Sequence, residues 1–358
     1  MKYYKRFSNC FLVKGYITYT IYDIFRREVF VINKQTYDLL CNDIIDEKSL
    51  HLLPNKKAKE LLDAEIIFEC NIEDNDLFPE IETNWHSPFN ILNCIIDIEE
   101  NSRFNFKEIF KQLDSLSCKN LQLRFKSDIQ GNIIIDILNS LADLNIRNTE
   151  LIIPFNDLII KNITCDFENI SNIIVYDASR NGIELHNGCQ IIFTEEKQWN
   201  PKQCGVIDPT YFVCNSDLFI ESQSFNTCLN GKISIDYNGN IKNCPSCTHS
   251  YGNICNTTLG EALNHPSFKK YWNITKDKID VCKDCEFRHL CTDCRIFIKD
   301  PSNPYSQPAK CTYNPYIAKW QGEEGYVPVE YCGHYSPETG FVPDHNKISS
   351  LNIQNKTY

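Results

Sequence analysis

The sequence lacks any apolar run that approaches the length needed to span a membrane. A transmembrane helix needs roughly 20 consecutive apolar residues, so no membrane partner is expected. Residues 1–10 carry positive charge, but no apolar core or small-residue cleavage site of a secretory signal follows them. These absences predict a cytoplasmic protein in a reducing compartment.

Positive charge is also scarce. The chain has 36 Lys and Arg residues against 47 Asp and Glu residues, which gives a net charge of -11. Nucleic-acid-binding proteins normally present a basic face, so no nucleic-acid partner is expected. The chain also has no recognisable nucleotide-binding loop, no Ser-His-Asp or Cys-His arrangement that would indicate a protease, and no internal repeat.

Cysteine, in contrast, is abundant, with 19 residues in a chain of 358. In a reducing compartment, patterned cysteines bind metal or take part in catalysis more often than they form disulfides. About ten of the cysteines show no ligand spacing and are expected to be small buried apolar residues. This scattered group includes Cys10, Cys41, Cys70, Cys94, Cys118, Cys165 and Cys189.

The order of apolar segments predicts an α/β protein. Residues 1–83 show strand-like and helix-like segments at 15–25, 28–32, 34–41, 56–63 and 65–69. In residues 84–204, strands are expected at 89–98, 121–125, 150–154, 173–176 and 190–194, with helices at 106–116 and 133–144. Strands that alternate with helices indicate parallel β-α units. Their number is too small for a closed eight-stranded barrel, so a partial barrel or an open sheet is expected.

Residues 205–311 contain the patterned cysteines. Cys228 and Cys244 lie on either side of a hairpin signal, an Asn238-Gly239 pair between two alternating segments. A hairpin there would bring both thiols to the same end of a ribbon. Thr258 and Glu261 predict a helix capping box, and Pro266 is expected to start a second helix.

A denser cysteine cluster follows, in which Cys282, Cys285, Cys291 and Cys294 form a CxxC-x5-CxxC pattern and Cys311 is a fifth cysteine. Two thiolates two residues apart can reach one ion or cluster from a single tight loop. The spacing predicts a metal site, but it leaves zinc and iron–sulfur as alternatives because both accept four cysteine thiolates. Residues 312–358, rich in Pro, Gly, Tyr and Asn, are expected to form an irregular tail.

These motifs resemble the SPASM domain, the module that holds auxiliary clusters in radical-SAM peptide maturases. The matching features are Gly239-x4-Cys244, the turn Gly252-Asn253-Ile254, and Cys282, Cys285 and Cys291. The spacing from Cys291 to Cys294 is x2, where that family has x3.

The resemblance implies two iron–sulfur clusters, both of the [4Fe-4S] type. Cys282, Cys285, Cys291 and Cys311 would hold one of them. Cys228, Cys244 and Cys294 would hold the other, with Cys214 as its fourth ligand. Cys204, Cys247 or an open coordination position are the alternatives for that fourth place.

The motif CxxxCxxC, which binds the reductive cluster in radical-SAM enzymes, is absent from the chain. The segment 99–105, after the first expected strand of the barrel-like region, contains no cysteine. The chain is therefore predicted not to cleave S-adenosylmethionine. This combination, together with the segments 311–320 and 325–330, resembles the SPASM-domain maturases of grasp-with-spasm systems.

That resemblance implies four regions and two partners. Residues 1–83 would form a winged-helix-like unit that recognises a leader peptide, 84–204 a degenerate partial β/α barrel of radical-SAM type, 205–311 the SPASM domain and 312–358 the tail. The partners would be the leader of a precursor peptide and a separate ATP-grasp ligase.

The resulting hypothesis is an iron–sulfur accessory maturase for a ribosomally made, post-translationally modified peptide. Two alternatives stay open at this point. One is a redox enzyme that modifies peptides without S-adenosylmethionine cleavage, and the other is a structural zinc protein that acts as an interaction module.

Overall fold

The computed structural model describes residues 2–126, 129–141, 144–146, 148–167, 169–198, 200, 204–336 and 338–354. The chain forms two compact units that interleave in sequence. Unit 1 consists of Met1–Trp85, Gly205–Thr227 and Ile274–Tyr358, and unit 2 of His86–Cys204 and Cys228–Asn273. No helix of the described part is both long and apolar enough to cross a bilayer.

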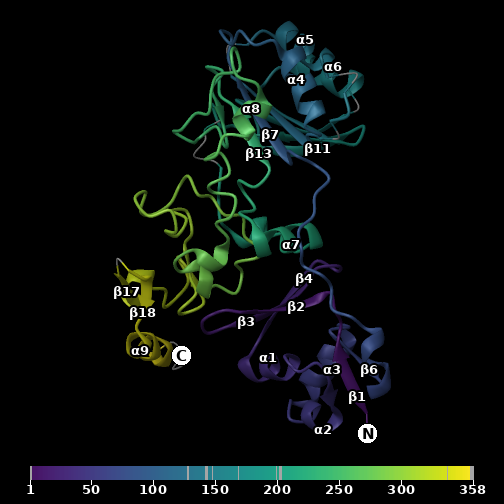
Figure 1. The fold of residues 1–358 in the computed structure, drawn as a ribbon, viewed down its shortest axis with the longest axis vertical. Helices are drawn as coiled ribbons and strands as arrows, with labels where there is room; N and C mark the ends of the chain where they lie inside the picture. Colours follow the sequence, from purple (N-terminus) through teal and green to yellow (C-terminus); the bar gives the residue numbers. More distant parts are fainter. Residues whose placement is uncertain are drawn as a thin grey trace. The chain divides into compact units, whose positions relative to one another are not determined.

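Unit 2 is built on an eight-stranded mixed sheet with the order β11-β12-β10-β9-β8-β7-β13-β14 (Figure 1). Six strands run parallel: β7 (Asn93–Ile98), β8 (Asn120–Phe125), β9 (Asn148–Pro154), β10 (Ile170–Tyr176), β12 (Cys189–Phe193) and β13 (Lys232–Ile235). The edge strands β11 (Gly182–His186) and β14 (Ile241–Lys242) are antiparallel to their neighbours. The expected parallel β-α units are confirmed. Pairing of β13 with β7 was not predicted, and it makes the first cysteine hairpin part of the large sheet.

Three helices connect the central strands: α4 (Phe106–Ser115), α5 (Gly131–Asn139) and α6 (Asp157–Asp166). Figure 1 shows them gathered on one side of the sheet, as right-handed crossovers between successive parallel strands require. Helix α4 buries Ile109, Phe110 and Leu113, whose spacing places them on one helix face. Helix α6 was not predicted. Helix α5 ends at Asn139, before the expected end at residue 144, and the expected part at 142 and 143 lies outside the described residues.

Unit 1 begins with two small antiparallel sheets, β5-β1-β6 and β2-β3-β4. Their strands are β1 (Tyr3–Arg6), β2 (Cys10–Lys14), β3 (Tyr19–Asp23), β4 (Glu28–Ile32), β5 (Ile45–Asp46) and β6 (Ile67–Cys70). Helices α1 (Lys34–Leu40), α2 (Glu47–Leu50) and α3 (Asn55–Asp63) and the 3-10 helix η1 (Ile72–Leu77) complete this part. The single strand predicted over 15–25 is wrong at its start, because Gly15 N–H donates to the Thr18 carbonyl in a turn that joins β2 to β3.

The remaining segments of unit 1 form short elements. They are η3 (Pro209–Tyr211), α7 (Ser216–Ser224), η4 (Lys276–Lys278), η5 (Cys282–Asp284), β15 (Tyr313–Asn314), β16 (Lys319–Trp320), η6 (Val329–Cys332), β17 (Gly333–Ser336), β18 (Gly340–Pro343) and α9 (His345–Gln354). The C-terminal segment is more regular than expected, since it contains two hairpins and a helix. Tyr316, Ile317, Val329, Phe341 and Ile348 form a buried cluster with Val281, so this segment is fixed by a hydrophobic core that it shares with the cysteine-rich part of unit 1.

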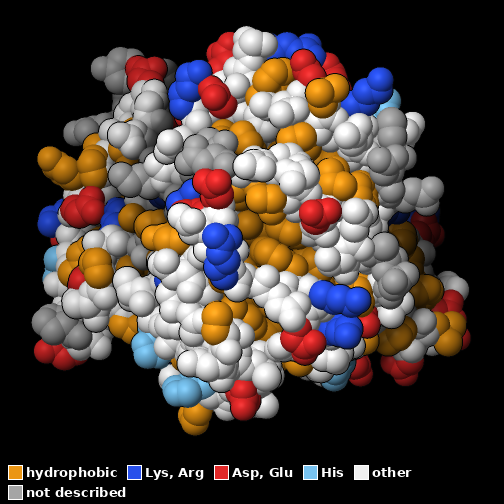
Figure 2. Space-filling model, turned by 90° about the horizontal axis from the view of Figure 1, so that it is seen from above, with side chains coloured by type: hydrophobic (Ala, Val, Ile, Leu, Met, Phe, Trp, Pro, Cys, Tyr) orange, Lys and Arg blue, Asp and Glu red, His pale blue; other side chains and the backbone are white. Residues whose placement is uncertain are grey.

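The scattered cysteines divide into two groups. Cys10, Cys94, Cys118 and Cys189 are buried, which confirms the expected packing role, whereas Cys41 is exposed and Cys70 is half-buried. The side chain of Cys165 lies outside the described residues. On the surface, Figure 2 shows acidic and basic side chains interspersed over the face that it presents.

The predicted cysteine hairpin forms between β13 and β14, where Ile235 pairs with Ile241. Gly239 takes φ +85° in its turn, which favours glycine at that position. The capping box at the start of α8 (Leu259–Leu263) is also present between Thr258 and Glu261. The second helix predicted after Pro266 is not formed, because turns occupy residues 266–273.

Gly252 is the glycine of this region that tolerates a side chain least. Its φ is +134°, and an added Cβ would lie 2.5 Å from the Thr257 hydroxyl. We expect Gly252→Ala to lower the free energy of unfolding by about 1–3 kcal/mol, measured by denaturant unfolding. Gly260→Ala is the matched control, because α8 leaves open space there and alanine favours a helix by roughly 0.5–1 kcal/mol over glycine. Equal stability of the two variants would contradict this account.

Candidate metal centre

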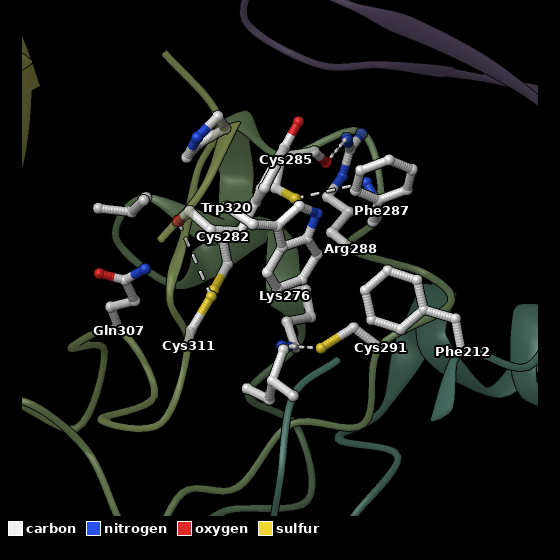
Figure 3. A pocket seen from close by; sticks show the side chains of 14 residues that line it. Phe212, Lys276, Cys282, Cys285, Phe287, Arg288, Cys291, Gln307, Cys311 and Trp320 are labelled. Atoms are coloured by element: carbon white, nitrogen blue, oxygen red, sulfur yellow. Dashed lines mark hydrogen bonds between the residues drawn. The ribbon is translucent and has the colours of Figure 1, made fainter. Parts of the chain in front are cut away.

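Four of the predicted ligands line one pocket of unit 1: Cys282, Cys285, Cys291 and Cys311. Helix η5 and the turn after it position the first two, because Cys285 N–H donates to the Cys282 carbonyl over 3.0 Å. Figure 3 shows the four cysteines around the pocket together with Lys276 and aromatic side chains such as Phe212 and Trp320. The spacing in the sequence therefore identified residues that the fold brings together.

The walls of this pocket are largely apolar, with Phe212, Phe287 and Trp320 among the lining residues. Burial raises the pKa of the Cys282 thiol to about 12 and the pKa of Cys285 well above its ordinary value. Such thiols lose their protons only when positive charge is supplied, and a bound metal supplies it. The donor set and its surroundings therefore fit a thiolate-ligated metal group.

Lys276 is a pocket residue that the sequence analysis missed. Its side chain is only 6% exposed, and its ammonium group donates to Cys291 Sγ over 3.3 Å. Burial alone would lower the pKa of this lysine, but Cys291, Cys282 and Asp293 together raise it. The ammonium group is thus kept charged beside the sulfur atoms.

A buried ionic network supports Lys276. Asp293 lies 3.8 Å from the Lys276 ammonium and 2.6 Å from the Arg295 guanidinium, and both members of the second pair are fully buried. Asn226 donates to the same carboxylate over 2.6 Å. Arg295 in turn donates to the Ser306 carbonyl over 2.7 Å. This network fixes the segment between Cys291 and Cys311.

A second group of cysteines lies in unit 2. Cys247 N–H donates to the Cys244 carbonyl over 2.9 Å, and a hydrogen bond from Cys244 lowers the pKa of the Cys247 thiol. Cys228 is close enough to act electrostatically on Cys247. The ammonium group of Lys232 lies 3.6 Å from Cys228 Sγ. Cys247, named before only as an alternative ligand, is therefore placed with Cys228 and Cys244.

The other predicted ligands have different surroundings. The Cys214 thiol faces the carbonyls of Asp23 and Glu28, each at 3.5 Å, and packs in a hydrophobic cluster with Tyr22. Cys294 is buried beside Gly205 in unit 1. Cys204, in unit 2, accepts a hydrogen bond from the Arg124 guanidinium over 3.7 Å.

Side chains that line the same pocket do not necessarily form a binding site for a single metal ion. Among the described residues, no group of three or more His, Cys, Asp or Glu side chains is arranged to hold one metal ion. The four cysteines of unit 1 share a pocket without forming such a single-ion site.

Lys232 also lines a hollow of about 600 Å³ in unit 2. Asn120 donates to Asn93 over 3.2 Å and Asn148 donates to Asn120 over 2.9 Å, so side-chain amides cross three neighbouring strands here. These residues lie at the amino ends of β7, β8 and β9. The sheet thus presents a polar surface next to the lysine that contacts Cys228.

Comparison with known protein families identifies part of this region. Residues 227–286 match the family model of SPASM, described as an iron-sulfur cluster-binding domain. The matched segment contains Cys228, Cys244, Cys282 and Cys285, and the remaining cysteines of the unit 1 pocket follow it. The chain therefore contains a segment similar to an iron–sulfur cluster-binding domain.

Among solved structures, the chain is similar to SuiB from Streptococcus suis, with 11% sequence identity and a TM-score of 0.34. The similarity covers 86% of this chain and 99% of that one. No curated protein matches the sequence.

Proposed function

We propose that this protein is an iron–sulfur accessory factor in the maturation of a ribosomally made peptide. The observation that carries the proposal is the pocket in which four cysteines lie together with a buried lysine. The SPASM match supports iron–sulfur chemistry. The missing CxxxCxxC motif argues for a role that does not cleave S-adenosylmethionine.

The proposed ligands of the first cluster are Cys282, Cys285, Cys291 and Cys311. For the second cluster, the proposed ligands within unit 2 are Cys228 and Cys244, and the hydrogen bond from Cys247 N–H to the Cys244 carbonyl supports Cys247 over Cys214 as a further ligand. When bound, such clusters supply one-electron redox capacity and cross-link the chain. The chain itself supplies thiolates, apolar walls and lysine ammonium groups.

Metal analysis tests this proposal directly. Protein purified without oxygen is expected to contain roughly eight irons and eight acid-labile sulfides per chain, with a broad absorption band near about 400 nm. One or two zinc ions without sulfide would instead indicate a structural zinc–thiolate protein. That outcome would remove the iron–sulfur part of the proposal and leave peptide binding to be tested alone.

Peptide recognition is proposed for the N-terminal part of unit 1, as a winged-helix-like unit. Strand β4 lies at the edge of its sheet, and β3 is its partner there. Val29 and Val31 on this strand are 37% and 58% exposed, and Phe25 just before it is 65% exposed. An exposed edge strand can bind an extended peptide through main-chain hydrogen bonds, and neighbouring apolar side chains add affinity. We therefore propose the β4 edge as the leader-peptide site.

Val31→Asp is expected to weaken leader binding about tenfold or more, because it places a charge in an apolar contact. Fluorescence anisotropy with a labelled synthetic leader peptide measures this. Leu52→Asp is the matched control, since Leu52 is an exposed apolar residue of the same unit. Unchanged affinity of the Val31 variant would remove the recognition assignment.

The rest of the architecture completes the proposal. Residues 84–204 would be a degenerate partial barrel that has lost its reductive cluster, and a separate ATP-grasp ligase would supply the nucleotide chemistry. Affinity capture of the ligase with the tagged protein would test that partnership, and a mixture that stays separate in size-exclusion chromatography would argue against a stable complex.

A further inference from the structure

The buried charges near Cys291 do not cancel. Lys276 and Arg295 contribute two positive charges, and Asp293 contributes one negative charge. Asp293 is closer to Arg295, at 2.6 Å, than to Lys276, at 3.8 Å. One positive charge is therefore in excess, and it belongs to the ammonium group that donates to Cys291 Sγ.

Such an arrangement is costly unless a negative group accompanies it. A lysine is almost never fully buried without a partner, and an uncompensated buried charge strongly destabilises a protein. The lining residues Phe212, Phe287 and Trp320 offer no negative charge. A thiolate-ligated cluster carries net negative charge and would balance the ammonium group.

The same pairing occurs in unit 2, where Lys232 lies 3.6 Å from Cys228 Sγ. The two lysines come from unrelated segments, one on a sheet strand and the other on a 3-10 helix. Each donates to a single cysteine of its group. Two independent occurrences make a chance contact a poor explanation.

We infer that Lys276 and Lys232 are positioning residues that hold and tune the two sulfur-ligated clusters, each by donating a charged hydrogen bond to one ligand sulfur. This inference rests on the proposed function. Hydrogen bonds to cluster sulfurs and nearby positive charge stabilise the reduced, more negative state. The lysines therefore raise the reduction potentials of their clusters and slow the loss of iron.

The test compares Lys276→Gln, Lys276→Arg and Lys232→Gln with the wild-type chain, all purified without oxygen. Lys56→Gln is the control, because it removes an exposed lysine from α3 of unit 1. Reduction potentials are measured by dithionite titration with electron paramagnetic resonance, and iron release is followed with a chelator. The expected result is a fall in the potential of one signal in Lys276→Gln and of the other in Lys232→Gln. Iron release should be about 10–100-fold faster, whereas Lys276→Arg stays close to wild type.

Each outcome has a defined meaning. Potentials and release rates equal to those of Lys56→Gln would overturn the inference while the proposed clusters stand. If Lys276→Gln fails to fold or to bind iron, recovery in Lys276→Arg supports the role of the charge, and failure of both variants overturns it. A wild-type chain that binds no iron or sulfide would overturn the proposed function and this inference together.

Discussion

Cys285→Ala is expected to lose about half of the bound iron and sulfide, because one of the two proposed four-iron clusters would lack a ligand. The cysteine sits in the CxxC turn of the unit 1 pocket, where its sulfur accepts from Phe287 N–H over 3.4 Å. Without the cluster, the remaining thiols and Lys276 stay buried with an unbalanced charge, so the thermal midpoint should also fall. Iron and sulfide content and a melting curve measure both effects.

Three further cysteine variants provide the control for this result and test the second site. Cys255→Ala is the matched control, since this exposed cysteine lies within the segment that matches SPASM, and full metal content is expected. A comparison of Cys247→Ala with Cys214→Ala tests the second site. Loss of iron in Cys247→Ala alone would support Cys247, rather than Cys214, as a ligand of the second cluster. Full metal content in Cys285→Ala would show that the first ligand set is wrong.

Asp293→Asn is expected to destabilise the protein strongly, although Asp293 is not one of the proposed ligands. The carboxylate is 1% exposed and is the buried partner of Arg295, whose side chain is fully buried. Removing one partner of a buried ion pair leaves an uncompensated charge and costs about 3–5 kcal/mol. Here two cations lose their shared anion. Denaturant unfolding under anaerobic conditions measures the change.

A surface carboxylate gives the comparison for this prediction. Asp300 is exposed and accepts from Ser302 N–H over 2.9 Å in a turn, which an asparagine also can do. Asp300→Asn should change stability by no more than about 0.5 kcal/mol. If both variants unfold at the same denaturant concentration, the buried network does not have the role assigned to it.

Much of the central fold could be predicted because its signals are local. The Asn238-Gly239 pair has few alternatives to a hairpin turn, and Thr258 with Glu261 forms the capping box that its spacing indicates. Other features depend on distant partners. Strand β13 pairs with β7 although the two segments lie more than 130 residues apart in the sequence, as the pairing of Ile233 with Cys94 shows. A local sequence pattern cannot predict such a pairing.

The candidate site was predictable to a similar extent. Close spacing in the sequence identified Cys282, Cys285 and Cys291, because residues in one tight loop must share surroundings. Lys276 was missed because a lysine in a polar stretch looks like a surface residue until burial is known. Cys214 was assigned from family resemblance, and its position against β3 and β4 depends on tertiary packing.

The interleaving of the two units has a consequence for how the chain is made. In unit 1, strand β3 hydrogen-bonds to a residue far downstream, since the Thr20 hydroxyl donates to the Glu286 carbonyl over 3.1 Å and the Tyr22 hydroxyl donates to the same oxygen. During synthesis, strand β3 cannot form these hydrogen bonds until more than 260 further residues have been translated and Glu286 has left the ribosome. Long-range closure of this kind slows folding and prolongs the exposure of apolar surface. The nascent chain is thus a candidate client for chaperones until its last third has been translated.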